Sequence, residues 1–149
     1  MIRLLFLTIS LLIGWPIRAS QLPPKVKANQ ERLFSGSAVT NWSVSEIDAE
    51  NTYLVEFDHN GQKQEAYYDA SGHLVSHLIH IGNLKKQVKQ ALTQDYKGAE
   101  VRRLVLSRTY KNGVNIHQRY TALLKTNKGL ISIHLAGEQA DKLSQLLKK

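Results

Sequence analysis

The stretch Leu22-Pro-Pro-Lys-Val26-Lys27, with Phe34-Ser-Gly36-Ser-Ala-Val39-Thr-Asn-Trp42 after it, sets the architecture of this chain because it is used twice. The second copy reads Leu84-Lys-Lys-Gln-Val88-Lys89, with Tyr96-Lys-Gly98-Ala-Glu-Val101-Arg-Arg-Leu104 after it, at a constant offset of 62 residues. Apolar residues match apolar residues, and glycine matches glycine. These are packing and turn positions rather than reactive groups. A match at a fixed period predicts one supersecondary unit used twice.

The first twenty residues have the layout of a secretory signal peptide. Arg3 gives a positive start, and residues 4–15 are nearly all apolar but too few to span a bilayer comfortably. Small residues Ala19 and Ser20 follow a proline. We therefore expect residues 1–20 to be a signal peptide and the mature protein to be periplasmic or secreted. A retained N-terminal anchor is the alternative, whereas a lipoprotein anchor is excluded because the chain has no cysteine.

The remaining 21–149 are enough for one domain with its own core. The absence of cysteine excludes thiol catalysis and thiolate metal sites. Removal of the signal peptide lowers the net charge from +8 to +6, which favours acidic partners. The lysines are nevertheless spread along the chain. The sequence lacks the concentrated basic stripe with interleaved aromatic residues that is typical of nucleic-acid binding, so we expect no nucleic-acid partner.

Local patterns predict the order of helices and strands. Proline at residues 23 and 24 suits the first turn of a helix, and Ser35-Gly36 ends that helix. Alternating strands are predicted at 38–47, 53–57, 62–69, 73–79, 100–110, 115–126 and 130–135, with a second helix after an N-cap at Asn83 and a third from residue 137.

This order predicts the α+β fold class: a tandem repeat of helix plus antiparallel strands, forming one extended antiparallel sheet with helices packed on one face. The two repeats cover about 22–80 and 83–136, and a C-terminal helix follows. The opposite face of the sheet is then open to solvent or to a partner.

The first repeat also resembles a known family. The matching features are the leucine-proline start, the aromatic-x-Gly turn, Tyr53-Leu-Val-Glu-Phe57, Asp58-His-Asn-Gly61 and Glu65-Ala-Tyr-Tyr-Asp69-Ala-Ser-Gly72. Together they resemble the PepSY-like group of secreted bacterial proteins, also described as β-lactamase-inhibitor-like, best over residues 22–106. The resemblance implies a periplasmic or secreted non-catalytic domain whose relatives bind proteins. No inhibitory motif is present to carry over.

Motifs that carry chemistry do not extend into complete sites. His73, His77 and His80 cannot all converge on one metal if they lie on a strand, because alternate residues point to opposite faces. The segments Asp58-His-Asn-Gly61 and Asp69-Ala-Ser-Gly72 fit hairpin turns better than calcium-binding loops. No nucleophile elbow, phosphate loop or dinucleotide fingerprint occurs. We therefore expect no enzyme activity, no cofactor and no bound metal.

Register predicts which side chains lie on each face of the sheet. Alternate residues of each strand, such as Trp42 and Val44, should face the helices and be buried in the core. The opposite face should carry tyrosine and arginine, which are favoured at protein interfaces. The candidate partner-binding residues are Tyr67, Glu65, Asn41, Arg103, Arg119 and His134. An extracytoplasmic protein is the expected partner, with a small ligand or envelope polymer as the alternative and an unrecognised enzyme third.

The export hypothesis predicts a defined N-terminus. Cleavage after Ala19 or Ser20 should leave a mature chain that begins at Ser20 or Gln21. The intact mass of the protein recovered from the periplasm or medium measures this. A mass that includes residues 1–19 would show that the segment is retained as an anchor.

Overall fold

The protein is described by a computed structural model over residues 22–47 and 50–148, so the expected signal peptide lies outside the described residues. The elements are α1 (Pro24–Leu33), β1 (Ala38–Ile47), β2 (Glu50–His59), β3 (Gln62–Tyr68), β4 (Leu74–Ile81), α2 (Lys86–Thr93), β5 (Glu100–Lys111), β6 (Val114–Thr126), β7 (Gly129–Ala136) and α3 (Glu138–Lys148). No helix in the described ranges is both long and apolar enough to cross a membrane.

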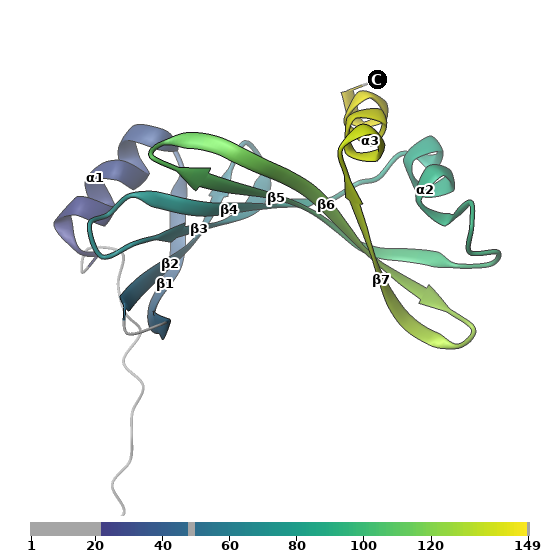
Figure 1. Ribbon diagram of the computed structural model, residues 1–149, viewed down its shortest axis with the longest axis horizontal. Coiled ribbons are helices and arrows are strands. Elements are labelled where there is room, and N and C mark those ends of the chain that lie inside the picture. The colour runs from purple at the N-terminus through teal and green to yellow at the C-terminus, as the bar shows by residue number, and fades with distance from the viewer. Residues whose placement is uncertain (1–21, 48–49, 149) are drawn as a thin grey trace, which may run out of the picture.

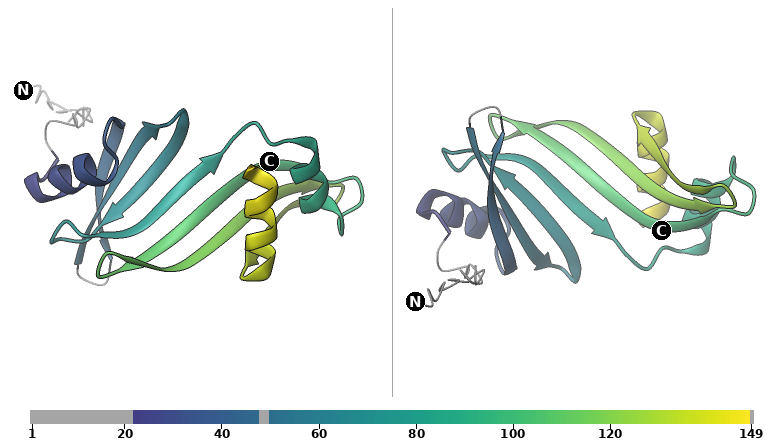
Figure 2. Two further views of the ribbon diagram at one scale, coloured as in Figure 1. Left: turned by 90° about the horizontal axis from the view of Figure 1, so that it is seen from above. Right: turned by 90° about the horizontal axis from the view of Figure 1, so that it is seen from below.

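The strands form one seven-stranded sheet in the order β1-β2-β3-β4-β5-β6-β7, and every neighbouring pair is antiparallel. All three helices lie on one face, with α1 at the β1 end and α2 and α3 at the other end (Figure 1). Seen from below, the strands have no described helix in front of them (Figure 2, right). The predicted α+β fold class is confirmed.

Local chemistry explains most element ends. Pro24 occupies the first turn of α1, where its missing N–H breaks no helical hydrogen bond. One prediction about a helix start is wrong: Asn83 does not cap α2, whose N-cap is Lys85. Asn83 instead has φ of 49°, in the left-handed region that asparagine tolerates better than most residues. It turns the chain between β4 and α2.

Matched positions of the two copies have matched surroundings. Val26 in α1 and Val88 in α2 are both fully buried. Gly36 and Gly98 both have φ of 77°, which an L side chain rarely adopts. The sheet register also shifts between Val39 and Asn41 in β1, and again 62 residues later in β5. Superposition of 22–62 on 84–129 as a duplicated unit remains a prediction.

The core forms two clusters on the helix-facing side. One, at the α1 end, includes Val26, Phe34, Phe57 and Tyr68. The other lies under α2 and α3 and includes Val88, Leu92, Leu104, Ala122, Leu124 and Leu143. The residues expected on this face are found there. Trp42, however, is only half-buried and Val44 is 47% exposed, because β1 is an edge strand with no neighbour beyond it.

Polar side chains within the first cluster are paired. The Tyr68 hydroxyl donates to Gln30 Oε1 at 2.6 Å. Gln64 Nε2 donates to the carbonyl of His59, so Gln64 Oε1 faces His77 Nε2 at 2.7 Å and accepts a hydrogen bond from the Nε2–H of His77. The His77 ring lies 4.7 Å from that of Phe34, between centroids. Burial, with smaller effects of Arg108 and His59, lowers the pKa of His77 to about 4.

His77 should therefore make folding stability depend on pH. Its folded pKa lies below the value of about 6.5 in an unfolded chain, so the unfolded state binds the extra proton between these values. The free energy of unfolding should fall by up to about 3 kcal/mol as pH drops from about 6.5 to 4. Urea unfolding across this range measures it. His77→Gln should flatten that part of the profile, and an unchanged slope would contradict the assignment.

Candidate functional site

The helix-free face of the sheet carries the predicted partner-binding residues. Directly paired residues of neighbouring strands share a face. Val55 and Ala66 face the core, so Glu56 and Glu65, one position along, face away from the helices. The same register places all six candidates, Tyr67, Glu65, Asn41, Arg103, Arg119 and His134, on the helix-free face. Their placement follows from the structure, whereas their role in binding remains a proposal.

The β1–β4 half of this face holds a hydrogen-bonded polar cluster. Glu56 and Glu65 lie directly opposite each other on β2 and β3, where two like charges repel. Each has a neighbouring donor: Asn41 Nδ2 donates to Glu56 Oε2 at 2.8 Å, and the Tyr67 hydroxyl donates to Glu65 Oε2 at 3.0 Å. His80 Nε2 lies 2.7 Å from Glu65 Oε1. These contacts fix the orientation of the Tyr67 ring edge and of both carboxylates.

Tyr67 titrates far from its ordinary range. Partial burial, the hydrogen bond to Glu65 and the charges of Glu65 and Glu56 together raise its pKa to about 12. At neutral pH its hydroxyl is thus a neutral donor to a carboxylate. The arrangement presents an oriented phenol rather than an activated nucleophile.

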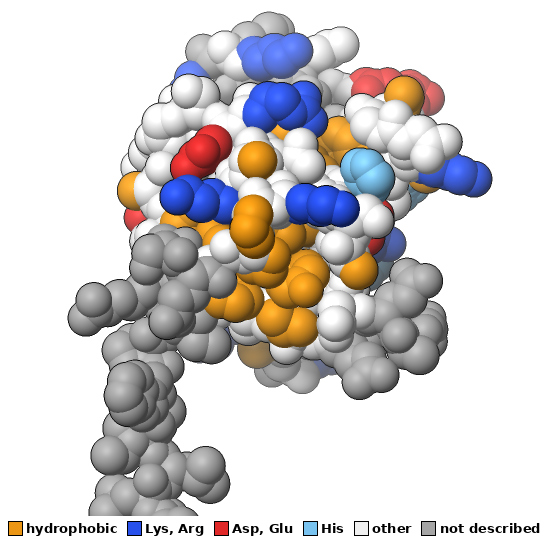
Figure 3. Space-filling view, turned by 90° about the vertical axis from the view of Figure 1, so that its left-hand side faces the viewer, with side chains coloured by type: hydrophobic (Ala, Val, Ile, Leu, Met, Phe, Trp, Pro, Cys, Tyr) orange, Lys and Arg blue, Asp and Glu red, His pale blue; other side chains and the backbone are white. Residues whose placement is uncertain are grey.

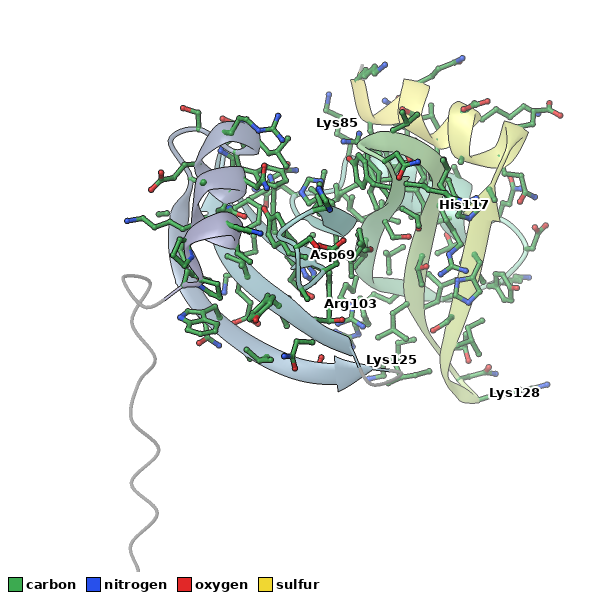
Figure 4. The ribbon with its side chains drawn as sticks, turned by 60° about the vertical axis from the view of Figure 1, so that its left-hand side comes forward. Asp69, Lys85, Arg103, His117, Lys125 and Lys128 are labelled. Carbon is green, nitrogen blue, oxygen red and sulfur yellow. The ribbon has the colours of Figure 1, made fainter. Side chains whose placement is uncertain are left out.

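The β5–β7 half of the same face is basic. Arg103, Arg119 and Lys125 are exposed on β5 and β6, and His134 lies beside Thr121 with its Nδ1 3.1 Å from the threonine hydroxyl. Arg103 pairs with Leu123, two residues before Lys125, so the two cations are diagonal neighbours (Figure 4). The six predicted residues therefore fall into an acidic group on β1–β3 and a basic group on β5–β7.

An aliphatic stripe crosses this face, and the sequence interpretation missed it. Leu54 pairs with Tyr67, and Leu78, Val105 and Leu123 follow diagonally on the next strands. All four aliphatic side chains are half-buried. The signal was present: Leu104-Val-Leu106 and Ala122-Leu-Leu124 are unbroken apolar runs. A strand with one solvated face should alternate, so such a run predicts apolar residues on both faces.

Deep cavities are not the main feature of this surface. A hollow of about 240 Å³ lies over the polar cluster, lined by Glu56, Asp58, Lys63, Glu65 and His80 among others. This volume is below the roughly 300–1,000 Å³ of typical small-molecule sites. A second hollow of about 430 Å³, lined by Lys63, His80 and Arg103 among others, adjoins it and is within that range. Within the described part of the chain, no three histidine, aspartate or glutamate side chains converge as they would around a metal ion. His77 and His80 point to opposite faces, as predicted.

Comparison with known proteins identifies the fold. No family model matches the chain, and no curated protein matches it. Among solved structures, a BLIP-like protein of Bacteroides fragilis is 14% identical, with a TM-score of 0.56 over 77% of this chain and 80% of that one. A DUF2874 family protein of Bacteroides uniformis is 14% identical, with a TM-score of 0.57 over 76% and 81%.

A protein of Bacteroides eggerthii, described provisionally as periplasmic, is 12% identical, with a TM-score of 0.59 over 76% of this chain and 81% of that one. At these identities the likeness concerns the fold. The resemblance to β-lactamase-inhibitor-like proteins, predicted from the first repeat, is thus confirmed at the level of architecture: the chain has the fold of the BLIP-like and DUF2874 proteins.

The polar cluster makes the pKa of Tyr67 dependent on Glu65. Glu65→Gln removes a negative charge and replaces the carboxylate acceptor, so the pKa of Tyr67 should fall from about 12 towards 10 while the effect of burial remains. Absorbance of tyrosinate during alkaline titration measures this, and Tyr67→Phe identifies the component that belongs to Tyr67. Identical titration curves for the wild type and Glu65→Gln would show that the two side chains are not coupled.

Proposed function

We propose that this chain is an extracytoplasmic, non-catalytic domain that binds another protein through the helix-free face of its sheet. The observation that carries the proposal is the aliphatic stripe, Leu54, Leu78, Val105 and Leu123, which continues through Tyr67 and has charged residues beside it. Protein interfaces share this anatomy of an apolar centre and a polar rim. These half-buried aliphatic side chains would lose their remaining contact with water in a complex, which favours association.

The rim supports a partner of mixed charge. Glu56 and Glu65 lie towards one end, and Arg103 and Arg119 towards the other, so a partner with basic and acidic patches in the opposite order would fit in one orientation. Tyr67 is held by Glu65, which lowers the entropy lost when it is immobilised in a complex. Tyrosine and arginine are the residue types that contribute most at such surfaces.

Two observations support an extracytoplasmic location. The first twenty residues have the layout of a signal peptide, and one protein with the same fold is described provisionally as periplasmic. Binding of a small molecule remains the alternative, and its candidate place is the hollow of about 430 Å³ lined by Lys63, His80 and Arg103 among others.

The proposal is tested by comparing the two faces of the sheet. A partner cross-linked to the tagged protein in the periplasm is identified, and its affinity is measured against Tyr67→Ala and Arg119→Ala. Each should weaken binding by about 1–2 kcal/mol, or about 5- to 30-fold. Lys86→Ala and Lys89→Ala, exposed on α2, are matched controls and should bind like the wild type.

Two results would overturn it. If Tyr67→Ala and Arg119→Ala bind as the wild type while the α2 variants lose binding, the helices form the recognition surface. If the captured material is an envelope polysaccharide whose binding depends on Arg103 and Arg119 alone, the basic half is a polymer site and the partner is not a protein.

A further inference from the structure

The edge strand β1 has features that the proposed function does not use. β1 has β2 as its only neighbour among the strands that the structure describes, so alternate residues direct backbone N–H and C=O groups outward. Protected edge strands usually carry charged residues, lysine above all, or proline; β1 has one charged residue, Glu46, and no lysine, arginine or proline over its ten residues. One interruption is present, the register shift between Val39 and Asn41. The strand beyond this shift is regular.

Apolar side chains adjoin this open edge. Val44 is 47% exposed, Leu33 at the end of α1 is 39% exposed, and Trp42 is half-buried. A hollow of about 530 Å³ lies between α1 and the start of β1, with Leu22, Phe34 and Val39 among its lining residues. Seen from this end, hydrophobic side chains gather in one area with lysine and arginine along its border (Figure 3). We call this region, β1 with the adjoining side of α1, the edge surface.

The wall formed by α1 is firmly held. Asn29 Nδ2 donates to the carbonyl of Gly72 at 2.7 Å, across the β3–β4 turn. Gly72 packs so closely that a Cβ there would lie 2.9 Å from backbone and Cβ atoms of Lys25. The hollow between this fixed helix and the start of β1 is pre-organised on its helix side, which favours binding of a segment without reorganisation of the domain.

Charge determines which occupant fits. The helix α1 carries Lys25, Lys27 and Arg32 against the single anion Glu31. Glu31 Oε1 lies 3.9 Å from Lys27 Nζ and offsets one of the three positive charges, so the helix keeps a net charge of +2. A second copy paired through β1 about a twofold axis would bring two such basic helices to one interface, where they would repel. A segment with acidic residues complements the same border.

We propose that the edge surface binds an extended segment of another protein, which has apolar residues at alternate positions and an acidic residue near α1, and which adds to the sheet beside β1. Main-chain hydrogen bonds to the outward groups of β1 supply sequence-independent affinity. Specificity comes from apolar side chains that pack on Trp42 and Val44 on the helix side, and from the carboxylate near Lys27. This surface is separate from the helix-free face and does not depend on the function proposed for it.

A phage-displayed library of random short peptides, selected on the purified full chain, tests the inference. The selected peptides should alternate apolar with polar residues and be enriched in aspartate or glutamate. Their affinity should fall at least about tenfold for Val44→Lys, which places a charge on the open edge. Leu130→Lys is the matched control, because Leu130 is 64% exposed on the opposite edge strand, β7. It should leave affinity unchanged.

A second variant tests whether the peptide needs an acidic residue. Lys27→Glu should weaken the acidic peptides by about tenfold and should leave peptides without acidic residues unaffected. The proposal would be overturned if the selected peptides bound the wild type and Val44→Lys with equal affinity. It would also be overturned if selection on the wild type enriched no peptides beyond those enriched by selection on Val44→Lys. Sedimentation that shows a dimer dissolved by Val44→Lys but not by Leu130→Lys would also overturn it, because the occupant would then be a second copy of the chain.

Discussion

The structure depends on one constraint: a seven-stranded antiparallel sheet is covered by helices on one face only. Three helices of eight to eleven residues bury the helix-facing side in two separate clusters, one below α1 and one below α2 and α3. The sheet itself is the element that joins them. The other face must then be stable without a cover, and its charged residues meet that condition through paired hydrogen bonds such as Asn41 with Glu56. Its aliphatic stripe does not, which makes the stripe the feature that most needs a partner.

Much of this architecture could be predicted from the sequence. The alternation around Tyr53 and Val55, and the glycine turns, indicate antiparallel strands, and the placement of Tyr67 and Arg119 away from the helices follows from register alone. These predictions succeed because antiparallel pairing and a period of two leave few alternatives once the hairpin turns are assigned. The internal match at 62 residues did not predict the two shifts of register, although they lie at corresponding positions of the two copies.

What could not be predicted depends on position within the sheet. Trp42 has the apolar partners of a core residue, yet it is half-buried because β1 is the outer strand; its counterpart in the second copy, Leu104, is fully buried because β5 is central. The hydrogen bonds of Glu65 could not be predicted either. His80 reaches Glu65 from β4 and Tyr67 reaches it along β3, and both contacts depend on side-chain rotamers. A sequence pattern gives a face for each residue but gives neither its distance from the sheet edge nor its rotamer.

The two proposed surfaces follow from the same incomplete burial, but they make different physical demands. The helix-free face presents side chains, and its oriented tyrosine and oppositely charged halves can distinguish one folded partner from another. The edge of β1 presents backbone groups, which any extended chain can pair with, so selectivity there has to come from the basic helix α1 and from the apolar side chains of Trp42 and Val44. Under the two proposals, one surface recognises side-chain shape and the other an extended backbone, so a folded protein and a strand-like segment would not compete for the same contacts.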